Sequence, residues 1–198
     1  MSDLRVHKTK YINETKRVSF KYDGKNYFGY EGDTLASALL ANGVHLIGRS
    51  FKYHRPRGIM SCGSEEPNAI CQISDKNDLT EPNVRATELE IYDGLEAFSQ
   101  NCWPNVKFDI GGINNLISPL IPAGFYYKTF MWPKSFWKKV YEPLIRMSAG
   151  LGKSPTEPDP DIYDHKYVHY DVLVIGGGLS GIISAKIAAK NNLKTLLV

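Results

Sequence analysis

The sequence predicts an α+β domain followed by the beginning of an α/β unit. Three observations support this division: alternating residues near the N-terminus, a middle rich in Pro and aromatic residues, and a glycine motif close to the C-terminus. They place a first domain at residues 1–100, a connecting segment with one helix at 101–165, and an incomplete β-α-β start at 166–198. A chain of 198 residues is long enough to form more than one such unit.

A β-hairpin is predicted over residues 15–32. Residues 17–22 alternate between polar and apolar, Asp23-Gly24 is typical of a two-residue hairpin turn, and residues 26–30 form the returning strand. The hairpin therefore gives the first domain two antiparallel strands.

A short helix is predicted after the hairpin. Asp33 or Thr34 can act as its N-cap, apolar residues follow at helical spacing, and Asn42-Gly43 is a C-terminal stop signal. Further strands are expected at residues 68–73 and 86–91. Two strands, a helix and then more strands is the order of a β-grasp domain.

The connecting segment is predicted to contain one helix, from about Ser135 to Ala149, that ends at Gly150 or Gly152. Residues 154–161 are expected to form an extended linker. The aromatic residues between 125 and 137 could line a flavin or folate site. Such clusters more often form a packing surface between domains or subunits, which is the interpretation we favour.

The glycine motif is predicted to open a Rossmann-type dinucleotide-binding domain. An apolar strand at residues 171–175 leads into Gly176-Gly177-Gly178-Leu179-Ser180-Gly181, and a helix and a second strand follow. The sequence ends inside that second strand, so we expect the chain to hold only the start of the domain.

The residues predicted to bind a dinucleotide are Gly176, Gly178, Leu179, Ser180 and Gly181. The first glycine permits a tight turn, the second lets a pyrophosphate approach the backbone, and the third lets the helix pack closely on the strand. The N-terminus of the helix adds unpaired N–H groups and partial positive charge. The acidic residue that would distinguish NAD from FAD is expected after the second strand, so both remain open on this ground.

Composition and charge exclude several other classes of protein. The net charge of +3 is too small, and its basic residues too scattered, to predict nucleic-acid binding. No apolar run approaches the roughly 18–20 residues of a membrane span, and no secretory segment is present, so neither a membrane protein nor a secreted one is expected. Three cysteines, Cys62, Cys71 and Cys102, fit the reducing cytoplasm.

No catalytic residue and no metal site are predicted within the chain. His165 and His169 are four residues apart but lack the Glu of a zinc-protease motif, and no Ser lies in a nucleophile elbow. The basic stretch at residues 48–58 could bind phosphate or RNA. We favour a loop that buttresses its own domain or a partner subunit, partly neutralised by Glu65 and Glu66.

Several stretches of the chain resemble the alpha subunit of heterotetrameric sarcosine oxidases. The matching residues are 31–40, 49–58, 63–69 and 123–130, and the glycine motif falls in the corresponding place. The resemblance covers nearly the whole chain from about Arg17 onward. Alpha subunits of that family are several times longer, so we expect this chain to be an N-terminal fragment.

The resemblance implies oxidative demethylation of sarcosine to glycine, with hydrogen peroxide as a product and folate capturing the one-carbon unit. It also implies NAD in the dinucleotide domain of this subunit. FAD, FMN and tetrahydrofolate are expected elsewhere in a complex with beta, gamma and delta subunits. The chain alone is therefore expected to be inactive.

A less specific resemblance links the first domain to ferredoxin-like domains of related amine-oxidising dehydrogenases. Their two-iron, two-sulfur clusters use a C-x-x-x-x-C-x-x-C spacing. Counted from Arg57-Gly58, these ligand positions fall on Ser61, Glu66 and Ala69, so a cluster-free domain is predicted. The alternative is an iron–sulfur electron-transfer module of a flavin-dependent amine, opine or proline dehydrogenase.

Overall fold

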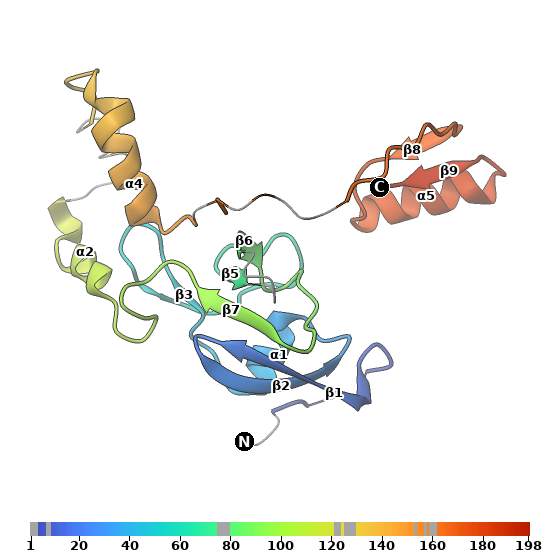
Figure 1. Ribbon diagram of the computed structural model, residues 1–198, viewed down its shortest axis with the longest axis horizontal. Helices are drawn as coiled ribbons and strands as arrows, with labels where there is room; N and C mark the ends of the chain where they lie inside the picture. Colours follow the sequence, from blue (N-terminus) through green and yellow to red (C-terminus); the bar gives the residue numbers. More distant parts are fainter. Residues whose placement is uncertain are drawn as a thin grey trace. The chain divides into compact units, whose positions relative to one another are not determined.

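The computed structural model describes residues 4–6, 9–74, 80–120, 124, 130–152, 154–156, 158 and 162–198. Its contacts divide the chain into two compact units, Met1–Pro158 and Asp159–Val198. Figure 1 shows the first unit in blue through green to light orange, and the small second unit in dark orange and red. Among the described residues, no helix has both the length and the apolar character needed to cross a membrane.

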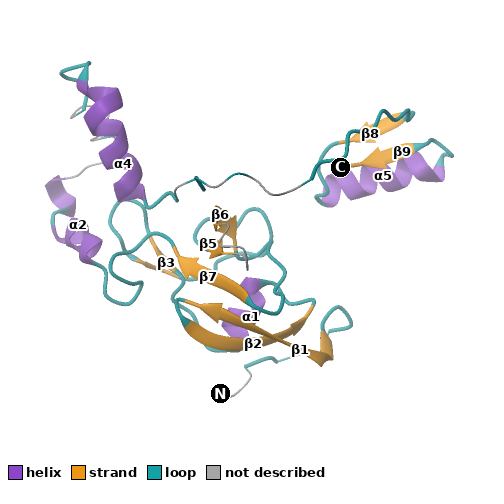
Figure 2. Cartoon of the chain, viewed as in Figure 1, coloured by secondary structure: helices purple, strands orange, loops and turns teal. Residues whose placement is uncertain are grey.

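The first unit is built on a mixed sheet whose strands, within the described residues, follow the order β2-β1-β7-β5-β6 (Figure 2). Strands β1 and β7 are parallel, and the other neighbouring pairs are antiparallel. Helix α1 packs its apolar face against this sheet. This is a ferredoxin-like β-grasp arrangement, as predicted. The bounds are β1 Asn13–Tyr22, β2 Lys25–Glu31, α1 Leu35–Ala41, β5 Ile70–Ser74, β6 Thr80–Arg85 and β7 Leu95–Ser99.

The described residues of the first unit also form shorter elements. Strands β3 and β4 form a two-stranded antiparallel ribbon, and the later elements are helical. Their bounds are β3 Gly48–Arg49, β4 Pro56–Arg57, η1 Ile110–Gly112, α2 Ile113–Leu116, η2 Ser118–Leu120, η3 Trp137–Tyr141 and α4 Glu142–Ala149.

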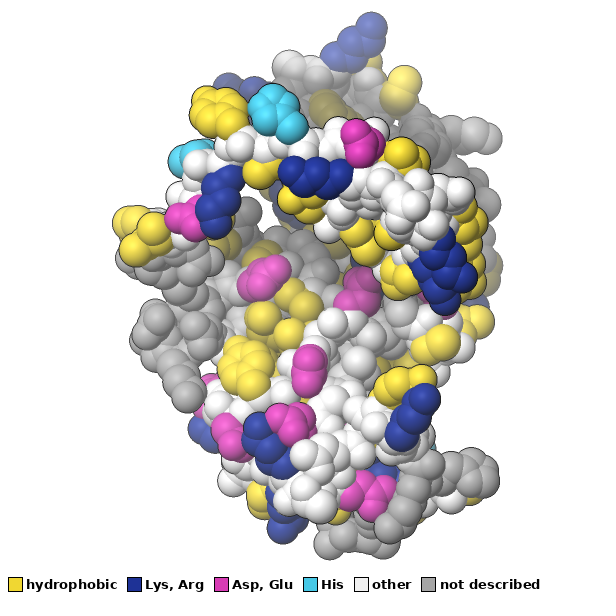
Figure 3. Space-filling view, turned by 90° about the vertical axis from the view of Figure 1, so that its right-hand side faces the viewer, with side chains coloured by type: hydrophobic (Ala, Val, Ile, Leu, Met, Phe, Trp, Pro, Cys, Tyr) yellow, Lys and Arg dark blue, Asp and Glu magenta, His cyan; other side chains and the backbone are white. Residues whose placement is uncertain are grey.

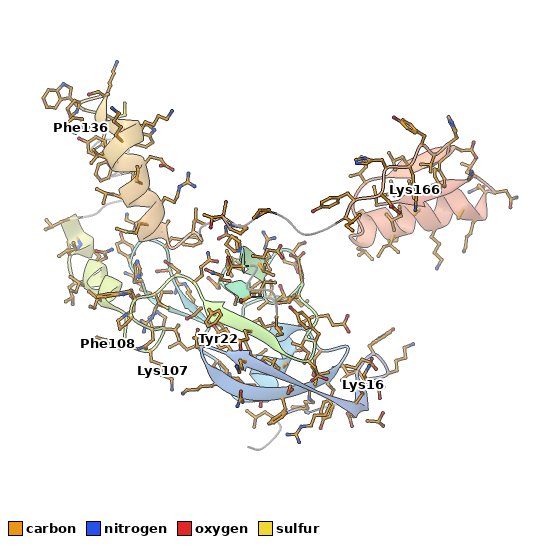
Figure 4. The ribbon with its side chains drawn as sticks, viewed as in Figure 1. Lys16, Tyr22, Lys107, Phe108, Phe136 and Lys166 are labelled. Carbon is orange, nitrogen blue, oxygen red and sulfur yellow. The ribbon has the colours of Figure 1, made fainter. Side chains whose placement is uncertain are left out.

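The predicted hairpin is confirmed, and its turn residues explain its geometry. Asp23 and Gly24 have φ angles of 47° and 73°, the left-handed pair that a two-residue hairpin turn requires. The alternation of β1 sends Phe20 and Tyr22 into the core, where each is 2% exposed. The Tyr22 hydroxyl, labelled in Figure 4, donates to the carbonyl of Ile47 at 2.9 Å. The hairpin therefore supplies both the sheet edge and part of the core.

The predicted helix start is confirmed, with Thr34 as the N-cap: its hydroxyl accepts from the Ser37 amide at 3.2 Å. The other candidate, Asp33, has a different partner. Its carboxylate is fully buried and accepts hydrogen bonds at 2.8 and 2.5 Å from the Arg5 guanidinium. The helix ends at Asn42, as the stop signal indicated.

The strand predicted at residues 86–91 is wrong, because that segment serves α1 instead of the sheet. The Ala86 carbonyl accepts from the Ala36 amide at 2.8 Å, and the Leu89 carbonyl accepts from Leu35 at 2.8 Å. These bonds satisfy first-turn donors of the helix. The strands in this region are β6 and β7, one on each side of the predicted range.

The basic stretch at residues 48–58 binds the start of the connecting segment, which supports its predicted buttressing role. The Arg49 guanidinium donates to the carbonyls of Val106 at 2.8 Å and Lys107 at 3.0 Å. Arg55 donates to the side-chain oxygen of Asn115 at 2.7 Å. On the face drawn in Figure 3, Lys and Arg side chains stand singly among acidic, apolar and other polar groups.

The predicted helix at 135–149 is present as the π-helix η3 followed directly by α4. It ends at Gly150, which has a left-handed φ of 67°. Trp132, Phe136 and Trp137 are 81%, 48% and 46% exposed, and Phe136 lies near the N-terminal end of the helix (Figure 4). Residues 125–129 of the predicted aromatic surface lie outside the described residues.

Within its described residues, the second unit consists of a parallel strand pair and one helix. Its elements are β8 Val172–Val174, α5 Leu179–Lys190 and β9 Thr195–Leu197. The strand, helix and strand lie where the sequence predicted them, and α5 contacts both strands.

Candidate functional site

The glycine motif forms one tight turn between β8 and α5. Gly176 has a φ of 105°, a conformation that side chains with a Cβ rarely adopt. Its amide donates to the carbonyl of Val198 at 2.6 Å, and the Val198 amide donates to Val174 at 3.0 Å. The turn is thus tied to the end of β9 while it redirects the chain into the helix.

Gly178 and Gly181, two further glycines of the motif, have contrasting surroundings. A Cβ placed on Gly181 would lie 1.9 Å from the carbonyl oxygen of Gly176, so the helix reaches the turn only because this residue has no side chain. A Cβ placed on Gly178 would meet no atom within 4 Å. Gly181 is therefore required by packing in the chain itself, whereas Gly178 faces open space.

Helix α5 presents free backbone donors beside Gly178, its N-cap. The Ile182 amide makes the helical bond to the Gly178 carbonyl at 2.9 Å, so the amides of Leu179, Ser180 and Gly181 precede it in the first turn. Leu179 and Ser180 are exposed. The structure brings the five predicted residues into one turn, and its open backbone and helix end are suited to an anion. Dinucleotide binding by these residues stays a prediction.

The second unit leaves most of its apolar side chains uncovered. Leu173, Ile183 and Ile187 are 56%, 48% and 56% exposed, and none of the described residues of this unit is buried. Parallel strands in proteins are normally covered on both faces. One helix covers only one face of the β8–β9 pair, so the unit has the apolar surface of a sheet that further elements would cover.

A second candidate site is the cluster loop, which we define as residues 58–69 and which contains the three counted ligand positions. Its central residue, Glu66, is 1% exposed. One carboxylate oxygen accepts from the amides of Met60 at 2.8 Å and Ser61 at 2.7 Å. The other accepts from Asn68 at 2.8 Å and Ala69 at 3.3 Å. We call these four donors the amide cage.

The amide cage decides the ionisation of Glu66. Burial by itself raises the pKa of the Glu66 carboxyl, but the hydrogen bonds from the cage outweigh burial and leave the pKa below its usual value. Glu66 is therefore an anion at neutral pH. The hydrogen-bond partners of the Glu66 carboxylate are backbone amides instead of arginine side chains. Partial neutralisation of the basic stretch by its charge stays a prediction.

The cysteines do not provide a place for an iron–sulfur cluster. Cys62 is exposed, Cys71 is buried in the core, and Cys102 lies beside the Ser99 hydroxyl at 3.2 Å. Burial raises the pKa of Cys71 to about 12, which keeps the thiol protonated. In the part of the chain that the structure describes, no group of three or more His, Cys, Asp or Glu side chains is placed to hold a metal. These residues do not fit a cluster.

Two partly buried partners, His54 and Asp109, were missed because they are distant in sequence. The Nδ1 atom of His54 lies 2.6 Å from an Asp109 carboxylate oxygen, beside a cavity of about 230 Å³. Asp109 also accepts from the amides of Trp103 and Gly111 at 3.0 and 3.1 Å. His54 has a φ of 52°, which marks a constrained backbone. The pair joins the basic stretch to the connecting segment. The residue types of His54 and Asp109 alone give no signal that these two side chains contact each other.

Comparison with known proteins gives a family match for the first domain and relatives for the whole chain. Residues 15–102 match the family described as 2Fe-2S iron-sulfur cluster binding domain. The chain is 53% identical, over all 198 residues, to sarcosine oxidase subunit alpha of Rhizobium meliloti (strain 1021). It is 30% identical over 189 residues, or 94% of the chain, to sarcosine oxidase subunit alpha of Corynebacterium sp. (strain U-96). The resemblance predicted from the motifs is confirmed.

The chain spans a small part of these relatives: 20% of the Rhizobium subunit and 15% of the Corynebacterium subunit. Among solved structures, a crystal structure of L-proline dehydrogenase from P. horikoshii matches with a TM-score of 0.44 and 19% identity. That match covers 92% of this chain and 24% of the dehydrogenase chain.

Proposed function

We propose that this chain forms part of a sarcosine oxidase alpha-type subunit, an oxidoreductase that acts on CH–NH donors. The complete enzyme would convert sarcosine to glycine with release of hydrogen peroxide, and folate would capture the one-carbon unit. The observation that carries the proposal is the 53% identity to subunit alpha across all 198 residues. The 198-residue chain would contribute scaffold and cofactor-binding residues, with no catalytic residue of its own.

The proposed dinucleotide site of this chain is the turn between β8 and α5, within a Rossmann-type domain at residues 166–198. The residues that would hold NAD are Gly176, Gly178, Leu179, Ser180 and Gly181. The open space at Gly178 and the first-turn amides of α5 support this assignment. NAD supplies a hydride acceptor when bound.

The other cofactors and the partners belong to the proposed complex. FAD, FMN and tetrahydrofolate would bind outside residues 1–198, with beta, gamma and delta subunits, in the cytoplasm. The exposed aromatic residues of the connecting segment at 101–165, including Trp132 and Trp137, support a surface for packing between domains or subunits. The uncovered face of the second unit supports the same view.

The first domain, residues 1–100, would be a cluster-free scaffold. Its fold is related to cluster-binding domains, but the counted ligand positions hold Ser61, Glu66 and Ala69. The same family match favours the second candidate, an iron–sulfur electron-transfer module of a flavin-dependent amine, opine or proline dehydrogenase. Visible absorption separates the two: a cluster gives thiolate-to-iron bands at roughly 400–550 nm, and the scaffold gives none.

A chimera tests the proposed activity. The matching 20% of the Rhizobium subunit alpha would be replaced by this chain, and the complex assembled with the other subunits of that enzyme. We expect peroxide release that depends on sarcosine. A chimera that assembles with its cofactors but releases no peroxide would contradict the proposal.

A second pair of chimeras tests the dinucleotide site. Gly178→Val should abolish NAD retention in the assembled chimera, because its side chain enters the space left for the ligand. Gly24→Ala changes a glycine of the hairpin turn, far along the chain from the motif, and should leave NAD content unchanged. Equal NAD content in both variants would show that Gly178 is not part of the NAD site.

A further inference from the structure

We propose that the Glu66 carboxylate is a built-in anion that takes the place of an iron–sulfur cluster and closes the cluster loop without metal. The inference builds on the cluster-free part of the proposed function and goes beyond it, since it assigns a role to the residue at one of the counted ligand positions. Glu66 would thus be a substitute for the cluster, and not simply a residue at a position where a cysteine ligand is missing.

The first argument is the direction from which the donors come. Met60 and Ser61 precede Glu66 in the cluster loop, whereas Asn68 and Ala69 follow it, and all four amides point to the one carboxylate. Each carboxylate oxygen binds one side of the loop. The side chain therefore joins the two arms of the loop, as a central group enclosed by the loop would.

The second argument is chemical complementarity. An iron–sulfur cluster with its thiolates is an anionic group whose sulfur atoms accept hydrogen bonds from the surrounding protein. An ionised carboxylate has only acceptors, with about four lone-pair sites on two oxygens. Four amides converge on it here, so the amide donors alone match the capacity of the anion, and the Ser61 hydroxyl adds a longer contact at 3.5 Å. A neutral carboxamide would oppose two of the donors with its own N–H groups.

The third argument is the way the loop is connected to the helix. The Thr87 hydroxyl donates to the Gly63 carbonyl at 2.7 Å, and the Ala86 amide donates to Ala69 at 2.8 Å. The Ala86 carbonyl in turn accepts from the Ala36 amide in the first turn of α1. Closing the loop around Glu66 therefore also fixes the segment that satisfies the start of α1.

Two Glu66 variants test the role of the anion in the 198-residue chain, with Glu65→Gln as the matched control because Glu65 is the exposed neighbour. We expect Glu66→Gln to lower the melting temperature by about 10 °C and the control to shift it by at most about 2 °C. Glu66→Ala should lose at least as much, and added acetate should restore part of the loss in this variant only. Equal melting of Glu66→Gln and the control would overturn the proposal, as would acetate acting alike on all variants.

Amide exchange decides the matter if Glu66→Ala and Glu66→Gln do not fold. In the unaltered chain, the four amides of the cage should exchange at least about 100-fold more slowly than the amide of Ser64, which lies in the same loop. Exchange of all four at the Ser64 rate would overturn the proposal.

Iron and sulfide analysis of the same sample separates this inference from the proposed function. A bound cluster would overturn both the cluster-free scaffold and the role of Glu66. A metal-free chain with unprotected cage amides would overturn the role of Glu66 alone. Neither result tests the proposed oxidation of sarcosine, which the peroxide assay measures separately.

Discussion

The two units of this chain bury their apolar residues to very different extents. In the first unit, Leu35, Leu39 and Leu95 are completely buried between α1 and the sheet. In the second unit, none of the described residues is buried, although its strands and helix are also rich in apolar residues. Apolar composition therefore does not distinguish the units; the number of layers available to cover each sheet does.

The comparison also separates two ways of holding a turn. The cluster loop of the first unit is closed by an internal carboxylate, with all four cage amides bound to Glu66. The glycine turn of the second unit leaves the first-turn amides of α5 without a side-chain cap, next to Gly178, where a Cβ would meet no atom within 4 Å. A loop that contains its own anion is suited to a scaffold, and one that leaves its donors open is suited to a ligand.

The largest effect is expected from the ion pair between buried Asp33 and partly buried Arg5 in the first unit. Asp33→Ala removes the carboxylate that accepts hydrogen bonds from Arg5, from the Tyr30 amide and from the Ser37 hydroxyl. We expect a loss of about 3 kcal/mol in the free energy of unfolding, measured by urea denaturation with far-UV circular dichroism. Glu31→Ala, which removes the exposed partner of Lys16, is the control and should cost less. Similar losses would show that burial of the pair is unimportant.

The next effect separates packing from binding at the glycine turn. Gly181→Ala places a methyl group 1.9 Å from a backbone oxygen, so we expect the second unit to lose about 2 kcal/mol. Amide exchange in α5 should then become about 30-fold faster. Gly178→Ala meets no neighbouring atom and serves as the matched control, with exchange unchanged. If both variants exchange alike, the close approach of helix and turn is not what Gly181 provides.

The elements predicted correctly are those with local signals. Asp23-Gly24 fixes the hairpin turn, Thr34 fixes the start of α1, and Gly150 fixes the end of α4, each through backbone angles or a cap within a few residues. The strand–turn–helix of the second unit is local for the same reason. These features depend little on the rest of the chain.

The features that were missed depend on distant partners. Strand β7 pairs in parallel with β1, which is distant in sequence. The backbone of residues 86–91 forms hydrogen bonds with α1. The apolar pattern of residues 86–91 therefore predicted a strand in the wrong place. The ligand count located Glu66, but only the fold shows that four amides converge on its side chain. Sequence distance also concealed the pair between His54 and Asp109.

A third prediction concerns the dependence of the stability of the first unit on pH. The pKa of Asp33 is raised by burial, but hydrogen bonds from Arg5, Ser37 and Tyr30 outweigh burial and leave it below its usual value. The pKa of Glu66 is lowered as well, so both carboxyls stabilise the folded state above their unfolded pKa values, near pH 4. That stabilisation should be lost as the pH falls through the lower, folded values.

The slope of this loss is measurable. Each carboxyl can contribute at most about 1.4 kcal/mol per pH unit to the free energy of unfolding of the first unit. Urea midpoints at pH 7, 5, 4 and 3 would trace it, and Glu66→Gln should have a shallower slope than the unaltered chain. An unchanged slope would mean that Glu66 does not titrate with unfolding.

The smallest effect is expected on the uncovered face of the second unit. Leu173 is 56% exposed on β8, whereas its neighbour Val174 approaches α5. In the 198-residue chain, Leu173→Ser should therefore change stability by no more than about 0.5 kcal/mol, and Val174→Ser should cost more. In the assembled chimera the relative effects of Leu173→Ser and Val174→Ser should change, because further sheet or helix would cover Leu173 there. Leu173→Ser should then reduce the yield of complex, whereas an unchanged yield would mean that this face stays open to water.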